Sequence, residues 1–214
     1  MLKRIFNDKQ YRKKSIELFS LIFSAVFGTF NGILSIISSS IWFLMLSIYY
    51  LALSIARIGI YCYKQGVREK TKLASIKLYR NSGIFLLVMN FAIGVAVLQI
   101  VFIEKRFNYP GLFIYAVATY AFTKITLAII NISKTRGTKN YTEMSLRSIN
   151  LIDASVSILA LQTALISEFS DGTSDITIMN GITGAVVFLF TLAFGMFMII
   201  KAHKEIKRTK SNGK

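Results

Sequence analysis

The chain has 214 residues, of which 54% are hydrophobic and 17% charged, and its mean hydropathy is +0.55. Soluble globular proteins rarely combine such apolar content with so few charges, so the composition indicates an integral membrane protein. The net charge of +16 does not indicate nucleic-acid binding, because the bases lie in four short patches beside apolar segments and form no separate domain.

The chain starts with a basic segment over residues 1–15. Leu2, Ile5, Phe6 and Tyr11 interleave with bases there, which fits a short amphipathic helix on the inner leaflet and equally a frayed basic tail. The apolar stretch that follows exceeds the core of a cleaved signal peptide, so we expect the first span to be retained.

A helix needs about 20 mainly apolar residues to cross a hydrocarbon core about 30 Å thick. Windows that meet this requirement are residues 16–37, 41–63, 83–103, 111–133, 149–167 and 181–200. They are continuous and of helical length, unlike the alternating pattern of membrane β-strands. The sequence therefore predicts an all-α, polytopic membrane bundle of six transmembrane helices over residues 16–200, followed by a basic cytoplasmic tail over residues 201–214.

Lysines and arginines outside the windows gather on alternate connecting segments. One side holds 22 of them, and the opposite side holds two, Lys105 and Arg106. Because basic residues are retained in the cytoplasm, this asymmetry predicts that both termini are cytoplasmic. The bases are also expected to attract anionic headgroups, which makes membrane lipids the expected partner.

Small residues recur every four positions in the first window, at Ser20, Ser24, Gly28 and Gly32. Such a strip lets two helix backbones approach closely, within one subunit or between subunits. We therefore expect Ser24, Gly28 and Gly32 to serve helix packing. A homo-oligomer or a partner membrane protein is compatible with this strip.

The second window carries an arginine within the run YYLALSIARIGIYCY. Ser47, Tyr50, Ser54, Arg57 and Tyr61 follow one another at spacings of three or four, which places them on one side of a helix. Arg57 lies about six residues from the cytoplasmic end, roughly 9 Å deep at 1.5 Å per residue. Two uses fit this depth: the side chain snorkels to the headgroups, or it forms an ion pair inside the bundle.

Lys124 in the fourth window is deeper, about nine residues or roughly 14 Å from the inner end. Thr119, Tyr120, Thr123 and Thr126 surround it at helical spacing and predict a polar side. A lysine facing lipid at that depth would cost at least about 2.5 kcal/mol, so Lys124 is expected to face the interior. Lys124 is either a functional cation or a structural group that joins helices and is satisfied by hydroxyls and a carboxylate.

Asp153, in NLIDASVSIL at the start of the fifth window, is the carboxylate available to compensate these cations. Its expected depth matches that of Arg57, so an ion pair between Arg57 and Asp153 is the first hypothesis. Lys124 would then have no carboxylate at its own level. A deprotonated lysine or an anionic ligand would resolve that.

Amides add polar groups to the third and fifth windows. Asn90 and Gln99 are nine residues apart and cannot share one helix face, and Gln99 and Gln162 are expected to form interhelical hydrogen bonds. NFAIGVAVLQ and DASVSILALQ align at an offset of 63. This fits three repeated helical hairpins, although apolar spans also resemble one another by composition alone.

Enzyme chemistry finds little support. The single histidine, His203, lies in the basic tail and Cys62 is the single cysteine, so Ser-His, Cys-His and HExxH arrangements within a span are absent. No P-loop or GxGxxG is present to hold a nucleotide, and the acids of SEFSDGTSD lack the alternation of a calcium loop. We expect no enzymatic activity, no cofactor and no metal.

The segments SIWFLMLSIYYLALSIARIGIYCY and SLRSINLIDASVSILALQTAL are similar to segments of uncharacterised bacterial six-span membrane proteins. The resemblance covers the second and fifth windows and includes no active-site motif. It implies a bacterial plasma membrane and brings no activity with it.

Two classes of function follow from the polar side chains in the windows. The first is a small transporter with an internal site for a small, anionic solute or ion; the second is a non-catalytic membrane subunit that stabilises or regulates a partner complex. A cavity that reaches Lys124 would favour transport, and a sealed interior would favour the subunit. The candidate site comprises Arg57, Lys124, Asp153, Tyr50, Ser54, Tyr120, Thr123 and Asn90.

Overall fold

The computed structural model describes residues 9–66, 72–102, 113–133, 140–169 and 173–211. These residues form six α-helices with no strand among them: α2 (Lys9–Ser38), α3 (Ile41–Gly66), α4 (Lys72–Phe102), α5 (Phe113–Ser133), α6 (Tyr141–Phe169) and α7 (Thr173–Ser211). All six are long and apolar enough to cross a membrane, by length and composition. The predicted all-α membrane bundle is confirmed.

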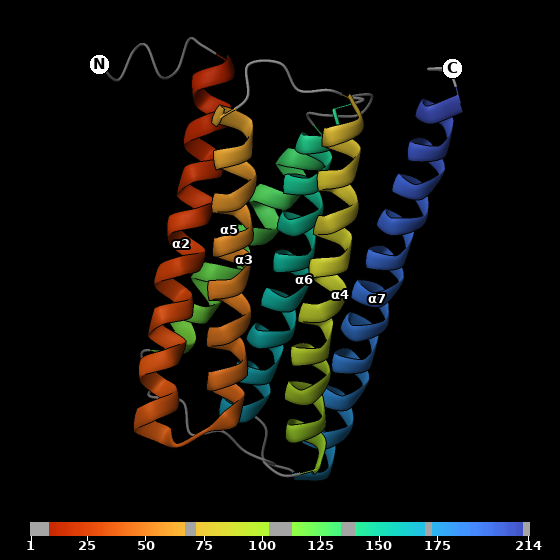
Figure 1. Cartoon of the computed structure of the whole chain (residues 1–214). Helices are drawn as coiled ribbons and strands as arrows, with labels where there is room; N and C mark the ends of the chain where they lie inside the picture. Colours follow the sequence, from red (N-terminus) through yellow and green to blue (C-terminus); the bar gives the residue numbers. More distant parts are fainter. Residues whose placement is uncertain (1–8, 67–71, 103–112, 134–139, 170–172, 212–214) are drawn as a thin grey trace.

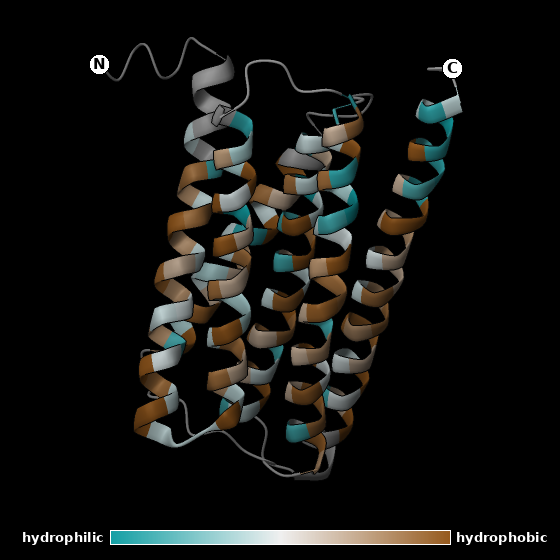
Figure 2. Cartoon of the chain, viewed as in Figure 1, coloured by the Kyte–Doolittle hydropathy of each residue, from teal (hydrophilic) through white to brown (hydrophobic). Residues whose placement is uncertain are grey.

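The helices run up and down, so that α2 begins and α7 ends at the same end of the bundle (Figure 1). We call this end the terminal face. The other end, where α2 turns into α3, is the opposite face. Hydrophobic residues predominate along the helices between the two faces (Figure 2). Many large ones are exposed there, as expected for surfaces that contact lipid and not water.

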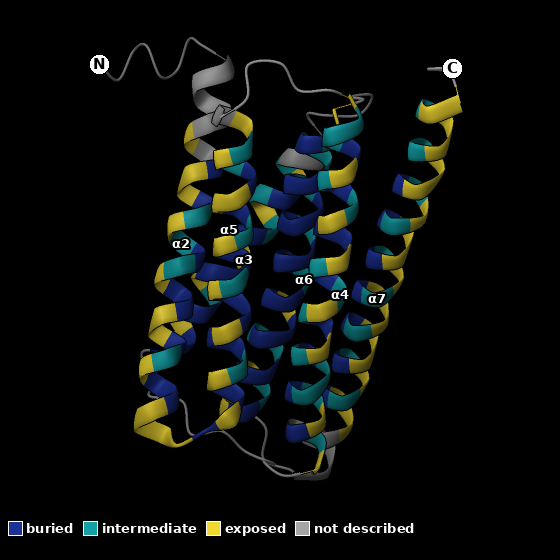
Figure 3. Ribbon diagram, viewed as in Figure 1, coloured by how far each residue is buried: buried dark blue, intermediate teal, exposed yellow. Residues whose placement is uncertain are grey.

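Helix α6 lies at the centre of the bundle. It packs against α3, α4, α5 and α7, and Figure 3 shows buried residues along most of its length. The closest helix pairs are α2 with α3, α4 with α7, and α5 with α6. The described parts of α4 and α5 do not pack together, so the middle hairpin of the proposed repeat is not a packed unit. Internal duplication stays a prediction.

Glycines set the contact between α4 and α7. A Cβ added at Gly184 would lie 2.7 Å from Val97, and one added at Gly195 would lie 2.8 Å from Leu87. Both distances are shorter than a carbon contact allows, so these helices approach as closely as they do because glycine is present. The sequence analysis missed this pair.

The predicted packing strip of α2 joins it to α3. A Cβ at Gly28 would lie 3.2 Å from the backbone nitrogen of Leu51, and one at Gly32 would lie 2.9 Å from Ser47 Oγ. Helices α2 and α3 of one subunit therefore approach closely at Gly28 and Gly32, which is consistent with the expected packing role.

Helix α6 begins eight residues before the fifth window predicted from hydropathy, because its first turn is capped by polar residues. Asn140 Oδ1 accepts a hydrogen bond from the backbone N–H of Thr142 at 3.0 Å. Glu143, three residues after the cap, forms an ion pair with Arg147 at 3.3 Å. This earlier start places Asp153 about three turns inside α6, not at its beginning.

The turn between α2 and α3 follows the common pattern that ends a helix with one left-handed residue. Ser39 has a φ of 48°, and the backbone N–H of Ser40 donates to the carbonyl of Ser35 at 3.3 Å. At the other end of the chain, α7 continues through the predicted tail to Ser211. Residues 1–8, Lys105, Arg106 and Asp171 lie outside the described residues.

Candidate functional site

Three charged side chains from three helices meet inside the bundle. Asp153 Oδ2 on α6 lies 2.5 Å from Arg57 Nη2 on α3 and 2.8 Å from Lys124 Nζ on α5. We call these three residues the charge cluster. Their exposed fractions are 1% for Arg57, 2% for Lys124 and 0% for Asp153. The predicted ion pair between Arg57 and Asp153 is confirmed.

Hydroxyl groups surround the charge cluster. Tyr120 Oη donates to Asp153 Oδ1 at 3.0 Å. Ser24 Oγ on α2 accepts from Arg57 Nη1 at 2.6 Å and also accepts from Lys124 Nζ. Lys124 Nζ donates as well to the carbonyl of Ser20 at 2.8 Å and to Ser20 Oγ at 3.0 Å. Four helices, α2, α3, α5 and α6, therefore meet at this point.

Helical spacing explains why these groups converge. Ser20 and Ser24 are four residues apart on α2, as are Tyr120 and Lys124 on α5, so each pair lies on one helix face. In each pair one residue lies about a turn nearer the terminal face than the other. The two pairs and Asp153 form a compact polar layer across the bundle.

With all three groups ionised, the charge cluster has a net charge of +1, because two cations share one carboxylate. A buried ion without compensation costs several kcal/mol. One donor is also unused: Arg57 Nε is buried and has no hydrogen-bond partner among the described residues. A small anion would supply both the missing charge and the missing acceptor.

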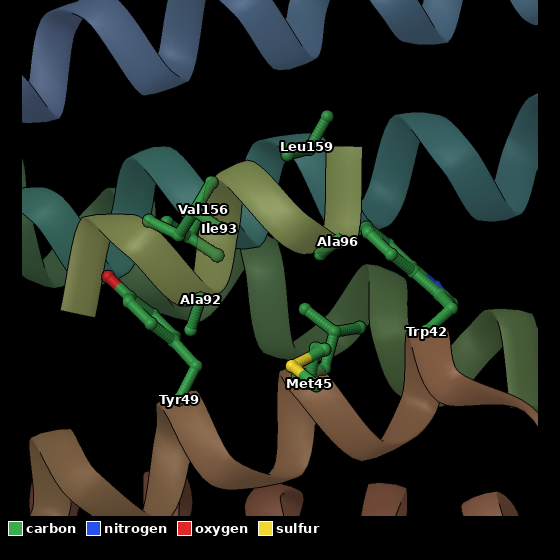
Figure 4. Close-up of a pocket in the computed structure, with 9 residues that line it drawn as sticks. Trp42, Met45, Tyr49, Ala92, Ile93, Ala96, Val156 and Leu159 are labelled. Carbon is green, nitrogen blue, oxygen red and sulfur yellow. The ribbon is translucent and has the colours of Figure 1, made fainter. Parts of the chain in front are cut away.

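The charge cluster is sealed from solvent in this conformation, since its three side chains are at most 2% exposed. A small cavity of about 10 Å³ lies between α3, α4 and α6. Figure 4 shows that this cavity is lined by apolar side chains such as Trp42, Met45 and Leu159, and by Tyr49. None of the three charged residues lines it. Of the two functions considered from the sequence, the sealed interior favours the non-catalytic membrane subunit over the transporter.

Several sequence-based expectations for Arg57 and Lys124 need correction. Arg57 does not snorkel to the headgroups; it points inward to Asp153. The expectation that Lys124 has no carboxylate at its own level is wrong, because Asp153 lies deeper than the fifth window implied and the lysine stem reaches it. Thr119 and Thr126 are exposed and donate to carbonyls of their own helix, so they do not extend a polar side around Lys124.

The other predicted site residues lie at different distances from the charge cluster. Tyr120 contacts the charge cluster directly, through its hydrogen bond to Asp153. Tyr50 is buried and its ring packs edge-on against Tyr120 with 5.1 Å between centroids. Ser54 donates to the carbonyl of Tyr50 at 2.9 Å, and Thr123 is half-buried.

Asn90 is buried on α4, a helix that contributes no residue to the polar layer, and its Oδ1 has no partner in the described part of the chain. The two glutamines differ. Gln162 Nε2 donates to the carbonyl of Met179 on α7 at 3.3 Å, as expected for an interhelical bond. Gln99 is buried, but neither its amide nitrogen nor its oxygen has a hydrogen-bond partner among the described residues.

Sequence reasoning missed the contribution of α2. Ser20 and Ser24 were assigned to packing alone, yet both accept hydrogen bonds from Lys124. Glu17, at the second position of the first window, was also missed; its Oε2 accepts from Tyr61 Oη at 2.8 Å. A signal was present, because Glu17, Ser20 and Ser24 are spaced by three and four.

No group of three His, Cys, Asp or Glu side chains that could hold a metal ion occurs within the described residues. No family model matches the chain, and no curated protein matches it.

Proposed function

We propose that this multi-pass membrane protein is a small transporter that carries a small anionic solute or ion through a site at the charge cluster. The observation that supports this most is the net positive charge of Arg57, Lys124 and Asp153 in the centre of the bundle. A purely structural role does not require the extra cation, since apolar side chains of similar volume often give equal or greater stability. Ionisable groups inside a membrane commonly mark a substrate or ion pathway.

Because the interior is sealed in this conformation, transport requires a conformational change that opens the charge cluster. Transporters enclose their substrate site between openings to the two sides, by moving one group of helices against another. The bundle offers two such groups. The first is α2, α3, α5 and α6, which share the polar layer. The second is α4 and α7, which are joined by their glycine contact.

The proposal is tested by flux in liposomes that contain the purified protein. Chloride, inorganic phosphate and acetate are the probes. We expect uptake of at least one probe above that of empty liposomes, and a loss of at least about tenfold in Lys124→Met, because that variant removes the cation that attracts the anion. Thr126→Val is the matched control, since Thr126 is exposed on the same helix and bonds only its own backbone.

Equal flux in Lys124→Met and the unchanged protein would remove Lys124 from the mechanism. Absence of flux for every probe would favour the second candidate, a non-catalytic membrane subunit that stabilises or regulates a partner complex. The sealed interior supports that candidate. In it, the charge cluster serves only to fix four helices, and a second copy or another membrane protein covers part of the helix surface.

The same proposal includes an orientation and a lipid partner. The terminal face carries exposed bases on α7, namely Lys204, Lys207, Arg208 and Lys210. Such a patch attracts anionic headgroups by about 1 kcal/mol per base near the surface. Together with the distribution of bases in the sequence, it supports a cytoplasmic terminal face. The resemblance to bacterial six-span membrane proteins adds a bacterial plasma membrane to the proposal. We assign no enzymatic activity.

A further inference from the structure

Glu17 is a second buried carboxylate, and the transport mechanism above does not use it. Resting on the proposed function, we propose that Glu17 carries protons between the terminal face and Lys124, so that anion binding at the charge cluster is linked to proton uptake from that face. Polar groups lie on one side of the charge cluster, and aromatic groups lie on the other.

A polar stripe on α2 leads from the terminal face to Lys124. Glu17, Ser20 and Ser24 lie at spacings of three and four, and their exposed fractions fall from 9% to 3% to 0% along the stripe. Side chains three or four apart on a helix are neighbours, with about 5–6 Å between their Cβ atoms. Ser20, three residues after Glu17 on this stripe, accepts from Lys124 Nζ through its Oγ at 3.0 Å.

Aromatic rings close the other side of the charge cluster. Phe27 and Tyr120 are stacked, with 3.9 Å between ring centroids and 9° between planes, and Tyr50 packs edge-on against each at 5.1 Å. Phe27 follows Ser24 on α2, whereas Tyr120 precedes Lys124 on α5, so this layer lies toward the opposite face. Proton access to Lys124 is therefore directed to the terminal face.

Polar and charged groups from two neighbouring helices face Glu17. From α3, Tyr61 donates to it at 2.8 Å, Arg57 lies further along the same helix face and Lys64 is exposed at the helix end. From α6, Arg147 interacts with Glu17 electrostatically, while bound to Glu143. The cation on α5 is Lys124, which is bound to Asp153.

The proton balance gives the coupling. When Lys124 is neutral, Arg57 and Asp153 cancel and the charge cluster has no net charge. A proton taken from water by the Glu17 carboxylate passes to Ser20 Oγ, which gives its own proton to the Lys124 amine. The charge cluster then carries +1 and binds one anion. The reverse transfer returns the proton to the terminal face and releases the anion, so the binding of one anion is linked to the uptake of one proton from that face.

The test measures charge displacement after a pH jump in protein-containing liposomes adsorbed on a solid-supported membrane. It uses protons as the probe and needs no transported solute. The unchanged protein is expected to give a transient displacement, and Lys124→Met is expected to abolish it. Glu17→Gln should slow the displacement about 100-fold, in the range by which a positioned acid or base accelerates proton transfer. Glu17→Asp should restore most of the rate.

A matched control variant removes a carboxylate elsewhere in the protein. Glu168→Gln removes an exposed carboxylate near the opposite face. It should stay within about twofold of the unchanged protein, well below the range for a lost acid or base. A Glu17→Gln rate within about twofold of the unchanged protein would overturn the inference.

Absence of displacement in the unchanged protein, with the protein folded and monodisperse, would overturn it as well. Flux of the anion probes, measured on the same preparations, separates the two proposals. Anion flux that needs Lys124 but neither Glu17 nor a pH difference would leave the proposed transport standing without the proton.

Discussion

Ser24 is the residue at which most of the polar contacts meet. Its hydroxyl lies 2.6 Å from Arg57 Nη1 and 3.2 Å from Asp153 Oδ2, and it accepts from Lys124 as well. These partners are 33, 129 and 100 residues away in the chain. Spacing within one helix predicts that a residue shares a face with its neighbours, but not which distant helix that face meets. For this reason the strip containing Ser24 was assigned to packing alone.

Replacing Ser24 by alanine should destabilise the protein by about 1–3 kcal/mol, because Arg57 Nη1 and Lys124 then lose a buried acceptor. Thr29→Ala is the control on the same helix, since Thr29 is exposed and donates to the carbonyl of Ala25. Its effect should stay within about 0.5 kcal/mol. The free energies of unfolding, measured by titrating detergent-solubilised protein with SDS, compare the two. Equal losses in the two variants would mean that the Ser24 contacts contribute little.

The arginine and the aspartate, by contrast, could be paired from sequence. Arg57 and Asp153 are ionisable groups inside apolar windows, and lipid forces such groups inward. That reasoning also placed Lys124 inside the bundle. It failed at Glu17, where a carboxylate close to the edge of a window was overlooked, and at Thr119 and Thr126, whose hydroxyls are satisfied by their own helix.

At the scale of the elements, hydropathy predicted all six helices and lost accuracy at their ends. The end of α2 and the start of α3 were predicted closely because an apolar run stops at the serines. The start of α6 was missed because Asn140 and Glu143 cap a polar first turn that hydropathy excludes. Helix pairing was not predictable either: apolar windows carry little information about direction, and the pair of α4 and α7 depends on where single glycines fall.

Gly184→Ala should weaken the contact between α4 and α7. The new Cβ would lie 2.7 Å from both Cγ atoms of Val97, so one helix must shift, at a cost of about 1–3 kcal/mol. Gly59→Ala is the matched control, because a Cβ at Gly59 meets nothing within 4 Å. Thermal unfolding in detergent should show a lower midpoint for Gly184→Ala only. A midpoint lowered equally by Gly59→Ala would indicate a general effect of substitution within a span.

At the scale of the whole molecule, two kinds of contact hold the helices of the bundle together. Close glycine packing joins α7 to α4, and the polar layer joins α2, α3 and α5 to the central helix α6. Water is absent from the hydrocarbon region, so each ionised group must find its partners within the protein. The charge cluster therefore acts as one electrostatic unit, and its stability depends on the sum of its charges.

The measurement that tests this claim most directly is a double-mutant cycle on Asp153 and Lys124, read as free energy of unfolding in SDS. Asp153→Asn leaves two unpaired cations and should cost about 3–5 kcal/mol. Adding Lys124→Met removes one of these cations, so the double variant should be more stable than Asp153→Asn alone, with a coupling of at least about 1 kcal/mol. Purely additive losses of unfolding free energy would contradict the account, because they would mean that Lys124 and Asp153 do not interact electrostatically.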